Sequence, residues 1–116
     1  MKRKFRAAFR GVKWGVRGHS SFFVHFFFTA LVLAAAAALR CDIVQWCILV
    51  GCIGMVLITE LINSSVETLF RQLDEATRDR AWPALDIAAG AVLAAAFFAA
   101  IIGGMVFASR LAELSR

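Results

Sequence analysis

The chain has 116 residues, of which 61% are hydrophobic and 18% charged, with a net charge of +5. The charged residues are gathered into short segments between long apolar stretches. This segregation is not the composition of a soluble domain and is typical of a small integral membrane protein. Three stretches approach or exceed the ~20 residues that cross a hydrocarbon core about 30 Å thick. We therefore expect one all-α membrane domain over residues 1–116.

The first segment, 2–18, is basic and amphipathic. It holds seven Lys and Arg residues and no acid. On a helix of about 3.6 residues per turn its apolar residues form one stripe, and most of the basic residues lie on the opposite flank. We expect this helix to lie along the membrane surface with its cations near anionic headgroups. A disordered tail or a nucleic-acid arm is the weaker alternative, because neither needs an apolar period; no nucleic-acid partner is expected.

Three membrane spans are expected after this helix, at 22–40, 43–67 and 84–109. The first is followed by no small-residue cleavage site, so we do not expect it to be removed as a signal sequence. The third is rich in Ala and Gly, which allow helices to approach closely in lipid. Three helices of one chain cannot easily bury so many small and polar residues. We therefore expect a homo-oligomer.

The segment 68–83 is expected to be a cytoplasmic loop, because Lys and Arg are retained on the cytoplasmic side of a membrane. This segment has three Arg residues, the N-terminal segment has seven basic residues, and the link between the first two spans has only Arg40. The count places the N-terminus in the cytoplasm and the C-terminus outside. Charges spaced by three and four also predict that the second helix continues beyond the membrane, until Pro83 stops it or begins the next helix.

Glu60, Asn63 and Glu67 are the most informative residues of the chain. Their spacing of i, i+3 and i+7 places them on one face of a helix, at the cytoplasmic end of the second span. Asp86 and His19 are expected at the same depth on the other two spans. Carboxylate and amide oxygens are ligands that Mg²⁺ accepts when phosphates complete its shell, which suggests ATP as a substrate. The plainer alternative is that Glu67 is solvated and Asn63 holds two helices together.

His25 lies deeper in the first span. A histidine hydrogen-bonded between helices is the plainer interpretation of its position, so we do not include it among the catalytic residues.

The run ELINSSVE, from Glu60 to Glu67, resembles the signature of the small trimeric prokaryotic diacylglycerol kinase and undecaprenol kinase family. That signature has Glu, two apolar residues, Asn, Ser or Thr, a small residue, an apolar residue and Glu. The resemblance extends over nearly the whole chain. It includes the N-terminal positions Phe5, Ala8 and Gly11, the segment 21–25 and the run DIAAGAVL at 86–93.

The resemblance implies a homotrimeric, multi-pass lipid kinase of the bacterial inner membrane. Such an enzyme uses ATP and Mg²⁺ to phosphorylate the hydroxyl of a lipid alcohol, either diacylglycerol to phosphatidic acid or undecaprenol to undecaprenyl phosphate. By position, Glu60 is implied as the general base and Asn63 as a positioning group. Glu67 is implied as a Mg²⁺ ligand beside the nucleotide, and Asp86 as part of the nucleotide site. These roles suit phosphoryl transfer, which depends on positioning and charge neutralisation.

Three positions depart from the family pattern. His19 stands at the metal-ligand position where an acid is common, and imidazole is a poor ligand for Mg²⁺. Leu85 replaces the usual Lys before Asp86, and Arg71 replaces an aspartate at the end of the signature. Arg80, Arg71 or Arg78 is one possible compensation, since Arg binds phosphate in a bidentate manner. The alternative is a degenerate, non-enzymatic membrane protein on the same scaffold.

Overall fold

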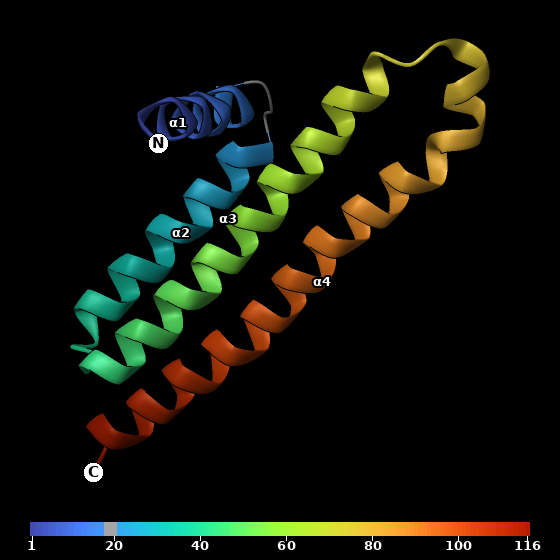
Figure 1. The fold of residues 1–116 in the computed structure, drawn as a ribbon. Coiled ribbons are helices and arrows are strands. Elements are labelled where there is room, and N and C mark those ends of the chain that lie inside the picture. Colours follow the sequence, from blue (N-terminus) through green and yellow to red (C-terminus); the bar gives the residue numbers. More distant parts are fainter. Residues whose placement is uncertain (18–20) are drawn as a thin grey trace.

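The computed structural model describes residues 1–17 and 21–116, and this part of the chain is all-helical. The helices are α1 (Lys2–Arg17), α2 (Ser21–Ala38), α3 (Ile43–Arg71) and α4 (Glu75–Leu114). Helices α2, α3 and α4 lie side by side and alternate in direction, whereas α1 lies across the end of the bundle where α2 begins (Figure 1). The central helix is α3, which packs most extensively against α4 and also contacts α2 and α1.

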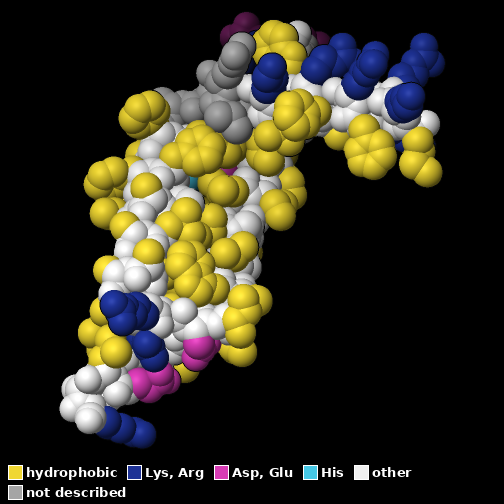
Figure 2. All heavy atoms as spheres, turned by 90° about the vertical axis from the view of Figure 1, so that its left-hand side faces the viewer, with side chains coloured by type: hydrophobic (Ala, Val, Ile, Leu, Met, Phe, Trp, Pro, Cys, Tyr) yellow, Lys and Arg dark blue, Asp and Glu magenta, His cyan; other side chains and the backbone are white. Residues whose placement is uncertain are grey.

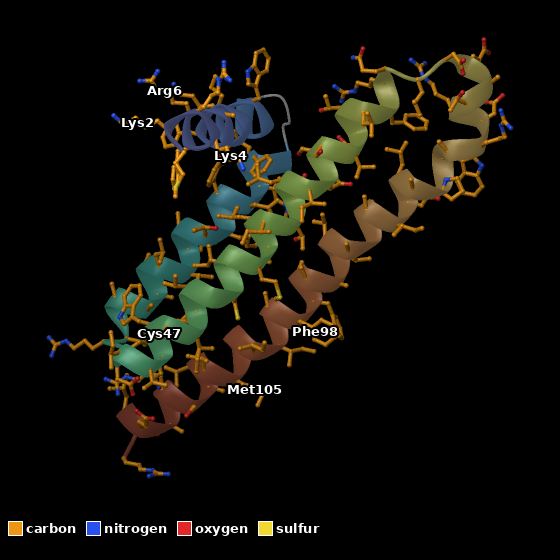
Figure 3. All side chains as sticks on the ribbon, in the orientation of Figure 1. Lys2, Lys4, Arg6, Cys47, Phe98 and Met105 are labelled. Atoms are coloured by element: carbon orange, nitrogen blue, oxygen red, sulfur yellow. The ribbon has the colours of Figure 1, made fainter. Side chains whose placement is uncertain are left out.

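Large apolar side chains cover the outside of this bundle. Figure 2 shows them along the bundle between the basic helix α1 and a second group of charged residues at the opposite end. Phe98 and Met105 project from α4 on the side away from α3 (Figure 3) and are 56% and 68% exposed. Within the described residues, α3 and α4 are long and apolar enough to cross a membrane, and the apolar part of α2, Phe22–Ala38, is shorter. The all-helical fold fits a membrane protein.

Helix α1 approaches α3 most closely at Gly15. A Cβ atom built on Gly15 would lie 2.6 Å from Cδ2 of Leu61 on α3, so the absence of a side chain at Gly15 permits this close approach. Phe5, Phe9 and Val12 on α1 are exposed.

The turn between α2 and α3 is built by capping. Arg40 has φ of 52°, a left-handed conformation usually taken by Gly. Its N–H donates to the Ala37 carbonyl, and the Cys41 N–H donates to the Ala36 carbonyl, which together form a Schellman motif. Asp42 then caps α3 through a reciprocal capping box with Gln45.

A small apolar core lies beside this turn, at the end of the bundle far from α1. Ala36, Cys41, Leu49 and Val106 are buried together there, one from each of α2, the turn, α3 and α4. The Arg110 side chain of α4 donates from Nε to the Leu39 carbonyl at 2.9 Å. This bond satisfies a carbonyl at the C-terminal end of α2 and joins α4 to α2 at this end of the bundle.

Helix occupies most of the segment 68–83, but the second helix does not continue to Pro83 as predicted, and Pro83 neither ends one helix nor begins the next. Helix α3 continues to Arg71, α4 begins at Glu75, and Pro83 lies inside α4, near a bend that is visible in Figure 1. Asp74 starts α4 by accepting a hydrogen bond from the Thr77 N–H at 2.8 Å. Hydrogen bonds from the Thr77 side chain and, with a smaller effect, from the Thr77 backbone hold the pKa of Asp74 below its usual value.

Candidate active site

Glu60 is a buried carboxylate in the part of α3 against which α1 packs. It lies on α3 and is only 3% exposed. Its Oε2 atom lies 3.2 Å from Nε2 of His25 on α2. A carboxylate is costly to bury in an apolar helix bundle, so a directional polar partner on the neighbouring helix is needed to hold it there.

Asn63 and Glu67 form a second polar pair one helical turn closer to the end of α3. The Asn63 Nδ2 atom donates to Oε1 of Glu67 at 3.2 Å. The Asn63 side chain is buried, and its Oδ1 atom has no hydrogen-bond partner among the described residues. A buried amide oxygen without a partner is unfavourable, unless a ligand donates to it or coordinates it.

The other predicted site residues lie apart from these pairs. Asp86 and Arg80 are on α4 and both are exposed, whereas Leu85 is half-buried. His19 lies outside the described residues, so its predicted place as a metal ligand stays a prediction. No group of three His, Cys, Asp or Glu residues is close enough to hold a metal ion within the described part of the chain. The structure therefore brings Glu60, Asn63 and Glu67 onto one helix face, and it leaves Asp86 exposed on a different helix.

The two arginines considered as phosphate ligands beside the α3–α4 turn have different surroundings. Arg78 donates from its guanidinium to the Arg71 carbonyl at 2.7 Å, which ties the start of α4 to the end of α3. The Arg71 side chain lines a groove between α3 and α1.

This groove between α1 and α3 lies beside the polar face of α3 and has a volume of about 890 Å³. Helix α1 lines it with small residues and the indole of Trp14, and α3 lines it with hydroxyl-bearing residues and Arg71. Ser64 is among the lining residues; it is 2% exposed, and its Oγ atom has no hydrogen-bond partner in the part of the chain that is described. A groove of this size with a few polar groups is typical of a small-molecule site.

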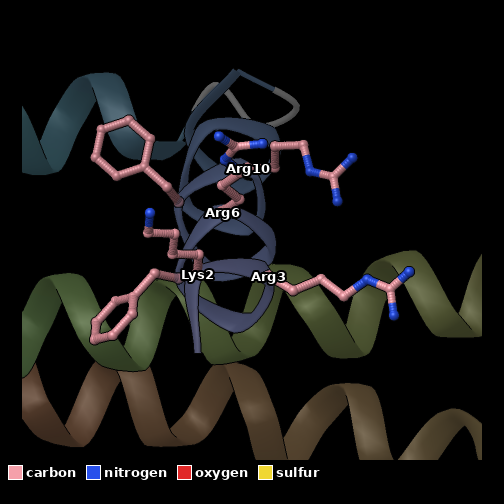
Figure 4. A pocket seen from close by; sticks show the side chains of 6 residues that line it. Lys2, Arg3, Arg6 and Arg10 are labelled. Carbon is pink, nitrogen blue, oxygen red and sulfur yellow. The ribbon is translucent and has the colours of Figure 1, made fainter.

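Helix α1 carries its cations and its phenylalanines on adjoining flanks. Lys2, Arg3, Arg6 and Arg10 line a shallow depression together with two phenylalanine rings. Figure 4 shows Arg3 and Arg10 extending to the side of α1 opposite those rings. Apolar and cationic groups on adjoining flanks are the arrangement of a helix that lies in a membrane interface.

Comparison with known proteins assigns the family. A family model described as prokaryotic diacylglycerol kinase matches residues 6–107, which is most of the chain. The chain belongs to the prokaryotic diacylglycerol kinase family. It is also 32% identical over 111 residues to a protein of Synechocystis sp. (strain ATCC 27184 / PCC 6803 / Kazusa) named diacylglycerol kinase. That match covers 95% of this chain and 63% of the relative, so the chain spans less than two thirds of the relative's length. No solved structure matches.

Two residues of this family member gain importance from the structure. His25 was expected to bond between helices, and it does, but its partner is the predicted base Glu60. Ser64 lies inside the signature run and was given no role from the sequence. The sequence indicates a role for His25 only through its polar side chain in an apolar helix. Its partner could not be predicted, because it depends on how α2 and α3 are aligned.

Proposed function

We propose that the chain is a lipid kinase that transfers the γ-phosphoryl group of ATP, with Mg²⁺, to the hydroxyl of a membrane lipid alcohol. Diacylglycerol is the acceptor suggested by the family name and by the name of the Synechocystis relative, and undecaprenol is the other acceptor to test. The observation that carries the proposal is the burial of Glu60, on the same helix face as Asn63 and Glu67. A structural role does not require a carboxylate at this position.

In the proposed reaction the lipid hydroxyl oxygen attacks the γ-phosphorus of ATP and ADP leaves. Glu60 accepts the hydroxyl proton, so that the product is a lipid phosphate and the proton is held on the carboxylate until it passes to water. Burial of Glu60 keeps water away from the attacking position and disfavours hydrolysis of ATP.

The residues beside Glu60 fit a Mg²⁺ ion. In phosphoryl-transfer sites Mg²⁺ is held by one or two carboxylates and by the substrate phosphates, so a cluster of three protein ligands is not required. Glu67 supplies a carboxylate, and the Asn63 Oδ1 atom is a buried oxygen without a partner among the described residues. When bound, the ion neutralises charge on the phosphates.

We assign the nucleotide to the groove between α1 and α3. Its lining combines the Trp14 ring, on which a base can stack, with the Arg71 guanidinium, which suits phosphate oxygens. Asp86 and Arg80, also proposed as nucleotide ligands, do not line this groove within the described residues. Their proposed roles therefore need a contribution from a neighbouring copy of the chain.

The proposed assembly is a homotrimer in the bacterial inner membrane, with α2, α3 and α4 as three spans and α1 on the cytoplasmic surface. It is supported by the exposed apolar surface of the single chain and by the row of small residues on α4.

The test uses purified protein in lipid micelles with radiolabelled ATP and Mg²⁺, and offers diacylglycerol and undecaprenol side by side. We expect labelled lipid phosphate from one of the two. Glu60→Gln and Glu67→Gln should each lower turnover by at least ~100-fold while the protein remains folded and oligomeric. Binding of ATP with Mg²⁺ without any transfer to lipid would instead identify a degenerate, non-enzymatic member of the family.

A further inference from the structure

The contact between His25 and Glu60 joins two membrane-embedded helices through polar atoms. The two residues are 35 positions apart, and Nε2 of His25 lies 3.2 Å from Oε2 of Glu60. The side chain of Glu60 is 4% exposed and that of His25 is 18% exposed, so water competes little for this contact. A hydrogen bond in such surroundings is directional and limits the orientations that the carboxylate can take.

The chemistry of the two groups sets the direction of this bond. An ionised carboxylate has no hydrogen to donate and can only accept. A Glu60 that is ready to accept a proton therefore requires His25 to carry a hydrogen on Nε2 and to donate it to Oε2. The same bond disfavours alternative positions of the Glu60 side chain, because in those positions the strong carboxylate acceptor would lose its donor.

We propose that His25 is a positioning residue for the kinase reaction: its Nε2–H bond holds the Glu60 carboxylate in the orientation from which it accepts the proton of the lipid hydroxyl. This inference rests on the proposed function. In the reaction the lipid O–H bond breaks toward Glu60, the lipid oxygen forms a bond to the γ-phosphorus, and the bond from that phosphorus to ADP breaks. His25 touches neither the lipid nor the phosphates and acts through Glu60 alone.

A positioning role differs from simple attachment of α2 to α3 in what it changes. Loss of attachment would lower the thermal stability of the protein, and the apparent kcat would fall only in proportion to the fraction of folded enzyme. Loss of positioning would lower kcat and leave the KM for ATP unchanged, because a misplaced base impairs the chemical step and not the binding of nucleotide.

Two variants separate these outcomes. His25→Phe keeps a planar ring but removes the donor, and we expect kcat to fall by about 10- to 100-fold, as is typical when a reacting group is misplaced by an ångström. His25→Gln keeps an amide N–H at a position similar to Nε2, and it should recover most of the lost kcat. Thr29→Val is the matched control: the Thr29 hydroxyl lies one turn along α2 and donates at 2.7 Å to the backbone carbonyl of His25, not to its ring. We expect Thr29→Val to leave kcat unchanged.

The double variant tests whether His25 acts through Glu60. In a Glu60→Gln background, adding His25→Phe should cause no further loss of the residual turnover, because the group that it positions is already gone. Equal fold-losses in both backgrounds would overturn the proposal, and so would a His25→Phe variant that keeps full kcat.

A spectroscopic measurement tests the contact without relying on lipid kinase activity. The chain has two histidines, so ¹⁵N-histidine labelling gives two pairs of ring-nitrogen signals, and the His25→Gln variant identifies the pair from His25. We expect Nε2 of His25 to be protonated and its signal to shift in Glu60→Leu. If the wild type phosphorylates neither lipid but this shift occurs, the proposed function fails and the contact stands. If the His25 signal is the same in Glu60→Leu, the contact and the positioning role are both wrong.

Discussion

Asn63 donates a hydrogen bond from Nδ2 to Oε1 of Glu67, one turn along the same face of α3, at 3.2 Å. The bond orients one oxygen of the carboxylate that we propose as a Mg²⁺ ligand. The other polar atom of the amide, the buried Asn63 Oδ1, has no hydrogen-bond partner among the described residues. Hydrogen bonds to metal-binding carboxylates orient the ligand as well as stabilise it. Asn63 is therefore as informative a position for mutagenesis as the two carboxylates.

The first prediction concerns this bond. Asn63→Ala should lower lipid kinase turnover, and it should weaken the apparent affinity for Mg²⁺ in the presence of ATP by ~10- to 100-fold. This is the usual effect of removing a residue that orients a metal ligand. Titration of Mg²⁺ at fixed ATP measures the change. Thr59→Ala serves as the control, because the Thr59 hydroxyl donates, within the described part of the chain, to backbone carbonyls of its own helix. Equal losses in the two variants would point to general damage to α3.

The second prediction concerns orientation. The distribution of Lys and Arg places the N-terminus in the cytoplasm and the C-terminus outside. A reporter that is active only in the cytoplasm, fused after Arg116, should therefore be silent, and the same reporter fused before Met1 should be active. A bright signal from the C-terminal fusion would place α1 and the groove on the side without ATP, and it would contradict the proposed function.

The third prediction concerns two departures from the family pattern. His19 replaces a hard anionic ligand, and Leu85 replaces a cation that would meet phosphate, so ATP with Mg²⁺ should bind weakly and turnover should be low. The double variant His19→Glu with Leu85→Lys should raise lipid kinase activity. Mn²⁺ should also support the wild type relatively better than Mg²⁺, because Mn²⁺ accepts nitrogen ligands more readily. Brisk turnover of the wild type with Mg²⁺, and no gain in the double variant, would direct attention to Arg71, Arg78 and Arg80.

The fourth prediction concerns the turn between α2 and α3. Arg40 occupies a left-handed conformation with φ of 52°, and a non-glycine residue there is strained by roughly 1–2 kcal/mol. Arg40→Gly should relieve this strain and raise the free energy of unfolding by about 1 kcal/mol, after the added flexibility of glycine in the unfolded chain is subtracted. Thermal unfolding in micelles measures the gain. Arg40→Ala retains the Cβ atom and should give no gain, so similar stabilisation in both variants would show that the effect comes from removing the charge.

The sequence by itself determined the features that depend on one helix at a time. Apolar length indicated a helical membrane protein, the period of α1 indicated its amphipathic character, and the spacing of Glu60, Asn63 and Glu67 placed them on one face. The hydrogen bond between Asn63 and Glu67 lies within that face. Such features follow from the sequence because the geometry of a helix fixes the angle between residues at a given spacing.

Only the tertiary structure decided what lies between helices. The pairing of His25 with Glu60 depends on how far α2 slides along α3, and nothing within either segment sets that distance. The exposure of Asp86, the groove between α1 and α3, and the short break at 72–74 also depend on packing and on caps. Apolar side chains can pack in many registers, so the register is set by the whole set of contacts, by close approaches such as that at Gly15, and by bonds such as that from Arg110 to the end of α2.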